Sequence, residues 1–166
     1  TEEVFTMPHR DRVNGTVKAT KPLSYSGSII DNFSFTFKDG RVTGFEAEQG
    51  GEGLQKLIDT DEGAKHLGEV ALVPNSSPIS QTGILFFNPL FDENAASHIA
   101  LGRAYAKTLT NGQDMDEDQF IEAGGNVSQT HVDFMIGGAG IDIDGITADG
   151  KREPIMRQGE WALEIE

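Results

Sequence analysis

The chain has 166 residues and a formal net charge of −14, from 27 acidic and 13 basic side chains. This length predicts one domain. The acidic surplus argues against nucleic-acid partners, which need a basic face, and against an anionic membrane surface. No apolar run reaches the roughly 18–20 residues of a membrane-spanning helix. The absence of cysteine excludes disulfides, thiolate ligands and cysteine nucleophiles, and it fits a reducing compartment, so we expect a cytoplasmic protein.

Short apolar runs separated by turns fill the first half of the chain. Phe33, Phe35 and Phe37 alternate with polar residues, which is the period of a half-buried strand. Asp39-Gly40 is a strong hairpin-turn signal, so residues 28–48 predict an antiparallel hairpin. The other elements expected in this half are a helix after residue 51, a short helix starting at residues 60–63, a strand over residues 67–73 and a loop over residues 74–83.

The second half predicts both helices and strands. Residues 84–87, Ile-Leu-Phe-Phe, predict a buried strand. Alanines between residues 94 and 105 favour a helix that Asn94 can cap. The remaining expected elements are an acidic helix over residues 116–123 and strands over residues 130–136, 141–146 and 160–165. This order of short elements predicts a single-domain α+β fold with a largely antiparallel or mixed sheet and a few short helices.

Glu69 lies inside an otherwise apolar run, His-Leu-Gly-Glu-Val-Ala-Leu-Val. Burying a charged carboxylate costs several kcal/mol unless it is paired or bound to a metal. Glu69 is therefore a functional acid in a central strand, an acid on the exposed face of an edge strand, or a member of an ion pair.

His131 and Asp133 are two residues apart in the predicted strand over residues 130–136, so their side chains share one face. An imidazole beside a carboxylate makes a suitable site for Zn, Co or Mn. The alternative is a hydrogen-bonded pair on a solvated face.

His98 and Tyr105 are seven residues apart in the predicted helix over residues 94–105. This spacing places them on the same helix face, within about 20° of each other. Gly102 lies between them on that face and leaves room for a pocket. The alternative is a helix whose small residues pack on the sheet, with both polar side chains hydrogen-bonded at its edge.

Four motifs in order along the chain, together with the stretches that link them, resemble the dinuclear-metal aminopeptidases typified by aminopeptidases T and S. The resemblance covers essentially the whole chain. Members of that family are longer and carry another domain ahead of this one, so residues 1–166 resemble only the carboxy-terminal, metal-binding catalytic domain. The motifs are residues 1–8 (TEEVFTMP), 67–72 (LGEVAL), 90–98 (LFDENAASH) and 128–137 (SQTHVDFMIG).

The resemblance implies two divalent metal ions, Zn, Co, Mn or Mg, with Glu69 as the bridging ligand. Tyr105 matches a tyrosine in the family's site, and we expect it to donate a hydrogen bond to the tetrahedral oxyanion. Glu2 is the candidate general base, although on an extended segment its side chain points away from that of Glu3. The implied metal ligands are Glu3, Glu69, Glu93, His98, His131 and Asp133.

The resemblance also implies a metal-dependent aminopeptidase. Such an enzyme takes peptide substrates with a free N-terminus and releases the first residue by attack of a metal-activated water. We further expect a homodimer in the full-length protein. Two alternatives remain: an isolated metal-binding domain that is inactive without its missing N-terminal domain, and an acidic interaction domain whose histidines and acids are structural.

Overall fold

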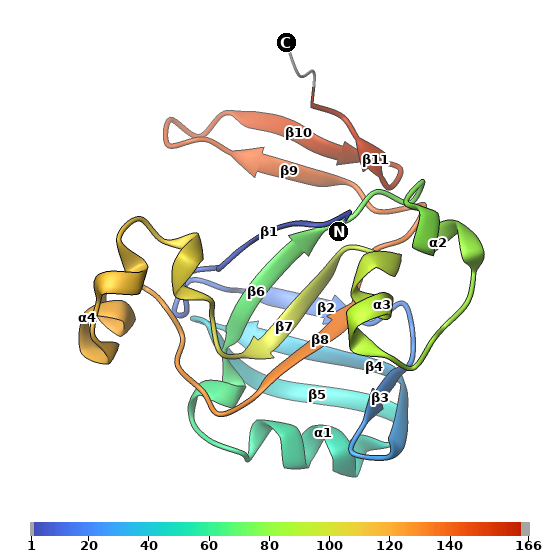
Figure 1. Cartoon of the computed structure of the whole chain (residues 1–166), viewed down its shortest axis with the longest axis horizontal. Coiled ribbons are helices and arrows are strands. Elements are labelled where there is room, and N and C mark those ends of the chain that lie inside the picture. The colour runs from blue at the N-terminus through green and yellow to red at the C-terminus, as the bar shows by residue number, and fades with distance from the viewer. Residues whose placement is uncertain (1, 164–166) are drawn as a thin grey trace.

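The computed structural model describes residues 2–163, and within that range the strands form three antiparallel sheets with short helices around them (Figure 1). The predicted single-domain α+β fold with antiparallel sheets is thereby confirmed. In the part of the chain that the structure describes, no helix is long and apolar enough to cross a membrane.

The first sheet is built around the predicted hairpin, which is confirmed. Its turn residues Asp39 and Gly40 have φ values of 50° and 82°, and two positive φ angles are typical of the tight turn that joins twisted strands. The short strands β2 and β3 pair with successive parts of β4. The strands are β2 (Gly15–Lys18), β3 (Leu23–Tyr25), β4 (Ser28–Lys38) and β5 (Arg41–Gln49).

The second sheet crosses the first and has the strand order β1-β6-β7-β8 (Figure 1). The hydrophobic core lies between these two sheets, because Phe134 packs against Phe33 and Phe35 with ring centroids 5.5 and 5.3 Å apart. The strands are β1 (Val4–Thr6), β6 (Leu67–Leu72), β7 (His98–Gly102) and β8 (His131–Met135). Helix α1 (Gly51–Ile58) closes the core with Leu54, Leu57 and Ile58.

The remaining elements lie around these two sheets. The third sheet lies beyond the N-terminal strand β1 in Figure 1. It contains β9 (Ile143–Ile146), β10 (Arg152–Arg157) and β11 (Glu160–Trp161). The strand expected over residues 160–165 is thus shorter, and residues 164–166 lie outside the described residues. The other helices are α2 (Pro78–Thr82), α3 (Pro89–Asp92) and α4 (Glu117–Glu122), with 3₁₀ turns η1 (Gly63–Lys65), η2 (Glu93–Ala95), η3 (Ala106–Thr108) and η4 (Gly112–Asp114).

The predicted helix over residues 94–105 is wrong. Residues 98–102 form the strand β7, which pairs with β6 on one side and β8 on the other, and every residue in it is buried. Alanine favours a helix only weakly, whereas a strand buried on both faces reads as a continuous apolar run. Tertiary packing therefore overrides local propensity here.

The predicted strand over residues 84–87 is also wrong. These residues form an irregular loop, in which Ile84 is 54% exposed and Phe87 is 55% exposed. Asp92 holds the loop, because its carboxylate accepts hydrogen bonds from the backbone N–H groups of Phe86 and Asn88 at 2.8 and 3.0 Å.

Candidate metal centre

Strand alternation in the second sheet separates an apolar face from a polar one. Ile99 and Phe134 point into the core, so their chain neighbours His98 and Asp133 point from the opposite face. The same alternation applies to β6, where Val70 packs against the core. The polar face of the three strands thus carries Glu69, His98, His131 and Asp133.

The register of the strands brings the two acids of this face close together. Glu69 pairs with Ala100, and Ala100 pairs with Asp133. Cross-strand partners project from the same face, so one methyl group lies between the two carboxylates. Ala100 is completely buried. The small side chain of Ala100 leaves space above the sheet, and the longer side chains of its neighbours can reach into this space.

Two overlapping groups of side chains offer ligand atoms that lie within 4.8 Å of one another. The first group is Glu3, Glu69 and His98, and the second is Glu69, His131 and Asp133. Glu3 reaches the first group from the segment just before β1. Glu69 belongs to both groups, which is the position that a bridging ligand would take.

The distances within these groups are longer than those of strong hydrogen bonds. His98 Nε2 lies 3.4 Å from Glu3 Oε2 and 3.5 Å from Glu69 Oε1, and His131 Nε2 lies 3.2 Å from Asp133 Oδ1 and 3.6 Å from Glu69 Oε2. Charge-assisted hydrogen bonds are about 2.7–2.9 Å long. Two ligands of a tetrahedral ion, each about 2.0–2.2 Å from it, lie about 3.4 Å apart. The distances between these side-chain atoms therefore fit ligand atoms arranged around cations.

Backbone carbonyls orient both imidazoles. The Nδ1–H of His98 donates to the carbonyl oxygen of Ala96 at 3.0 Å, and that of His131 donates to Arg103 at 2.7 Å. This arrangement leaves Nε2 as the free ring nitrogen in both residues, as in histidines that ligate metals. Among the described residues, the buried Nε2 of His98 has no hydrogen-bond partner. A metal ion would satisfy it.

The clustered acids shift the pKa values of their neighbours. Burial raises the pKa of Glu3, and the charges of Glu69 and Asp133 raise it further. Burial alone would lower the pKa of His131, but its contact with Asp133 and the charge of Glu69 raise it to about 9. Burial would also lower the pKa of His98, but the contact with Glu69, the Ala96 carbonyl and the charges of Asp133 and Glu3 together outweigh burial and raise it. The site thus attracts positive charge, which protons on the imidazoles or divalent cations can supply.

Tyr105 lies beside the cluster although it is not on a helix with His98. Its ring packs against His131, with centroids 4.9 Å apart, and against Phe5 at 6.1 Å. Burial raises the pKa of the Tyr105 phenol, and the charge of Glu69 and the other nearby carboxylates raises it further. The phenol therefore stays protonated and can donate a hydrogen bond.

Glu93 and Glu2 lie at the margin of the cluster. Glu93 is outside both ligand groups, but it lies close enough for their charges to act on it. Burial and the charges of Glu3 and Asp133 raise the pKa of Glu93. The side chain of Glu2 is exposed, while that of Glu3 is half-buried. The backbone N–H of Glu2 donates to Asn94 Oδ1 at 3.0 Å. Asn94 thus anchors the segment that carries Glu3, a contact that the sequence did not suggest.

Comparison with known proteins agrees with this geometry. A family model described as thermophilic metalloprotease (M29) matches residues 1–161. The chain is 59% identical over 165 residues to aminopeptidase 2 of Geobacillus stearothermophilus and 53% identical over 163 residues to aminopeptidase T of Thermus aquaticus. These matches cover 99% and 98% of this chain but only 40% of each relative.

A solved structure shows the same fold. The structure titled wild-type AmpT from Thermus thermophilus superimposes with a TM-score of 0.91 and 51% identity, over 98% of this chain and 40% of that one. The chain thus spans about two fifths of the length of the relatives that it matches. The polar face of the second sheet and these matches lead to one conclusion: the chain belongs to the thermophilic metalloprotease family M29.

Proposed function

We propose that the chain is the catalytic, metal-binding part of an aminopeptidase that releases N-terminal residues from peptides and works with two divalent metal ions. One observation carries the proposal, namely the two ligand groups that share Glu69. Membership of a metalloprotease family supports the reaction class. The names of the relatives support peptides with a free N-terminus as substrates.

Each ligand group would hold one ion. Glu3, Glu69 and His98 would bind the first, and Glu69, His131 and Asp133 the second. Mixed carboxylate and imidazole ligands suit Zn, Co or Mn, and Mg is the less favoured candidate because it prefers oxygen ligands. When bound, two such ions would supply the Lewis acidity that activates water and polarises a carbonyl.

The protein's own side chains would bind and orient the substrate. The carboxylates of the cluster attract a positively charged α-ammonium group, which favours a peptide's N-terminus over acidic segments. Tyr105 lies against His131 with a protonated phenol, so it can donate a hydrogen bond to the oxyanion of the transition state. Recognition of the free amine explains why cleavage would begin at the first residue.

Replacement of Tyr105 tests its assignment as the oxyanion donor. Tyr105→Phe keeps the ring that packs against His131 and removes only the hydroxyl. Loss of one such donor lowers kcat by about 10²–10³-fold. We expect this drop with unchanged metal content and nearly unchanged KM. A parallel loss of metal would instead make Tyr105 a ligand.

Two acids are candidates for the general base. Glu2 is a candidate because it adjoins the implied ligand Glu3, but its side chain is exposed. Glu93 is half-buried and has a raised pKa because of burial and its acidic neighbours. Glu2→Gln and Glu93→Gln, each compared with the wild type for kcat and metal content, separate them. The variant that loses kcat but keeps its metal identifies the base.

A metal and activity measurement tests the proposal as a whole. The purified chain is loaded with Zn or Co, its metal content is measured by elemental analysis, and hydrolysis of leucyl-p-nitroanilide is followed. N-acetyl-leucyl-p-nitroanilide is the matched control, because it lacks the free amine. The proposal predicts two equivalents of metal and hydrolysis of the free-amine substrate alone. A chain that binds no metal would overturn it.

A second candidate follows from the length comparison. The chain covers 40% of its relatives, so it could bind metal as an isolated domain and cleave nothing without the remaining part. Two equivalents of metal without hydrolysis would favour this alternative. Our proposal also includes a homodimer for the complete protein and a cytoplasmic location, which sedimentation and cell fractionation would test.

A further inference from the structure

Glu3 is the one member of the two ligand groups that lies outside the regular strands. Strand β1 begins at the next residue, and it is a three-residue edge strand that pairs with β6 alone. A segment beyond the end of such a strand frays unless another contact ties it down. Glu3 therefore needs a second anchor if its carboxylate is to stay beside Glu69 and His98.

Asn94 supplies this anchor. Its side-chain Oδ1 accepts a hydrogen bond from the backbone N–H of Glu2 at 3.0 Å. Glu3 is thus held between this bond and the pairing of Val4 with Leu72. Asn94 is only 8% exposed, and a hydrogen bond shielded from water is stronger than one at the surface. The amide fixes the backbone on the side of Glu3 that the sheet does not reach.

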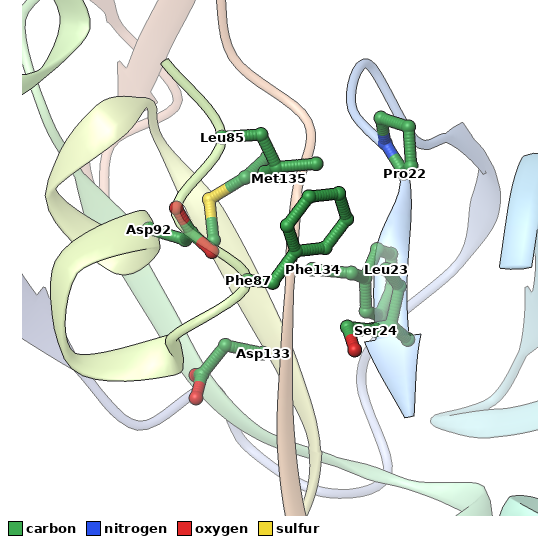
Figure 2. Close-up of a pocket in the computed structure, with 9 residues that line it drawn as sticks. All are labelled: Pro22, Leu23, Ser24, Leu85, Phe87, Asp92, Asp133, Phe134 and Met135. Carbon is green, nitrogen blue, oxygen red and sulfur yellow. The ribbon is translucent and has the colours of Figure 1, made fainter. Parts of the chain in front are cut away.

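The turn that carries Asn94 is itself held in place. The backbone carbonyl of Asn94 accepts a hydrogen bond from the hydroxyl of Ser77 at 2.9 Å, and Ser77 is buried. The turn η2 also contacts β8. Figure 2 shows Asp92, which precedes this turn, together with Met135 and Asp133 of β8, around one small pocket. A side chain on a fixed turn can hold a ligand segment accurately.

Asn94 belongs to a stretch of chain that serves the first ligand group. Two residues after it, the carbonyl of Ala96 accepts the Nδ1–H of His98. In the second group, the ring of His131 is oriented by the carbonyl of Arg103, which lies elsewhere in the chain. Loss of the Asn94 side chain should therefore disturb the ligands of the first ion and leave those of the second in place.

Resting on the proposed function, we propose that Asn94 is a positioning residue for the first metal ion and acts through Glu3. Its side-chain oxygen holds the backbone of Glu2, so that the Glu3 carboxylate is already in place beside Glu69 and His98. The ion then meets a preorganised ligand and does not have to order the segment as it binds.

Zinc titration of Asn94 variants by calorimetry tests this role without requiring hydrolysis. Asn94→Leu keeps a side chain of similar shape and removes the acceptor, and Asn94→Ala removes the acceptor and the volume. Loss of a group that orients a metal ligand lowers metal affinity about 10- to 100-fold. We expect this loss in both variants for one zinc equivalent, with nearly unchanged affinity for the other. Equal weakening of both equivalents would reveal a general structural role and overturn the proposal.

Two further variants serve as rescue and control. Asn94→Asp keeps an acceptor oxygen for the Glu2 N–H and should recover most of the lost affinity. Asn14→Ala is the matched control, because Asn14 Oδ1 also accepts a backbone N–H, that of Asp39 at 2.8 Å, in the first sheet. It should leave both equivalents unchanged. An equal loss in Asn14→Ala, or no recovery in Asn94→Asp, would contradict the role of the Asn94 oxygen.

A double-mutant cycle shows whether Asn94 acts through Glu3. Glu3→Gln alone should weaken the binding of one zinc equivalent, as measured by competition with a chelator. Because the segment then no longer presents a carboxylate, adding Asn94→Ala to Glu3→Gln should weaken that equivalent little further. The full loss of about 10- to 100-fold in both backgrounds would mean that Asn94 acts independently of Glu3, and would overturn the proposal.

Hydrogen exchange of the metal-free chain separates the anchor from the proposed function. Asn94→Ala should speed the exchange of the amides over residues 2–6, and Asn14→Ala should not. Unchanged exchange, or unchanged zinc affinity in Asn94→Ala, would overturn the positioning role and leave the proposed function intact, because the wild type still binds two ions. A wild type that binds no zinc would overturn the proposed function, and the positioning role with it.

Discussion

The acid Asp61 and the acids of the candidate metal centre differ in the groups that surround them. This difference explains why Asp61 is structural and the centre is a candidate for metal binding. Asp61 accepts hydrogen bonds from Ala64 N–H and Ser128 hydroxyl at 2.8 Å and from Gln129 N–H at 2.6 Å. Burial would raise the pKa of Asp61, but these hydrogen bonds outweigh it and hold the pKa below its usual value. The local fold supplies every donor that this carboxylate needs.

Glu69 and Asp133 have different neighbours. Around them lie other carboxylates and the Nε2 atoms of two imidazoles whose Nδ1–H groups already donate elsewhere. Carboxylate oxygens and unprotonated Nε2 atoms all accept hydrogen bonds, so they repel one another at close range unless a positive charge lies between them. A structural acid is therefore distinguished from a candidate cation site by whether its neighbours donate hydrogen bonds to it, and not by burial alone.

The largest expected effect is loss of metal on replacing the shared ligand. Glu69→Ala should remove both equivalents, because Glu69 belongs to both ligand groups. Asp61→Asn is the control and should keep both. Elemental analysis of the dialysed proteins measures the difference. Two equivalents retained in Glu69→Ala would abolish the distinction between the two sites.

The pH dependence of the Tm of the metal-free chain tests whether the candidate metal centre attracts positive charge. The pKa of His131 is raised from 6.5 to about 9. A group with a raised folded pKa contributes stability that is fully present below its unfolded value and is lost as pH rises through the folded value. The Tm of the metal-free chain should therefore fall between pH 6.5 and about 9.

Calorimetric scans with and without zinc check this dependence. The fall should be weaker in the zinc-loaded chain, because the ion takes the place of the proton on His131. It should also be weaker in metal-free His131→Gln. A Tm that is flat over this range without metal would contradict the raised pKa.

A smaller effect is expected at the structural acid. Asp61→Asn should cost about 1–3 kcal/mol of unfolding free energy at pH 7, because charged hydrogen bonds are weakened and one acceptor is replaced by a donor. The pKa of Asp61 is lowered in the fold, so its contribution is present above the unfolded value of 3.8 and is lost as pH falls through the folded value.

Urea titrations of Asp61→Asn and the wild type at pH 7 and at strongly acidic pH measure this difference. The gap between the two proteins should close in acid. A gap of the same size at both pH values would mean that shape, and not charge, determines the role of Asp61.

The smallest effect is expected at a solvent-exposed acid. Asp144 pairs with Arg152 at 3.1 Å and also contacts Arg157 on the outer hairpin of β9 and β10. Exposed ion pairs contribute little and are screened by salt. Asp144→Asn should leave metal content and Tm unchanged in physiological salt. A clear drop in Tm would show that this pair stabilises the third sheet.

Sequence patterns predicted the parts of the centre that lie on regular strands. The apolar run around Glu69 and the two-residue spacing of His131 and Asp133 both indicated strand positions, and the structure places these three residues together. Hairpin residues 28–48 were equally predictable, because the alternation and the turn signal agree.

Other parts of the centre could not be predicted from local patterns. His98 was expected on a helix, because alanine-rich segments favour helices and only tertiary packing makes residues 98–102 a central strand. Glu3 and Glu93 lie outside regular strands, so only the family resemblance singled them out. The carbonyls of Ala96 and Arg103 that orient the imidazoles carry no sequence signal, because any residue supplies a carbonyl.

The most direct test of the central claim is an anomalous-scattering measurement on a crystal of the zinc-loaded chain at the zinc absorption edge. The account predicts two peaks, one in contact with Glu3, Glu69 and His98 and the other in contact with Glu69, His131 and Asp133. Zinc peaks that are absent from this cluster, or that lie only elsewhere on the acidic surface, would contradict it.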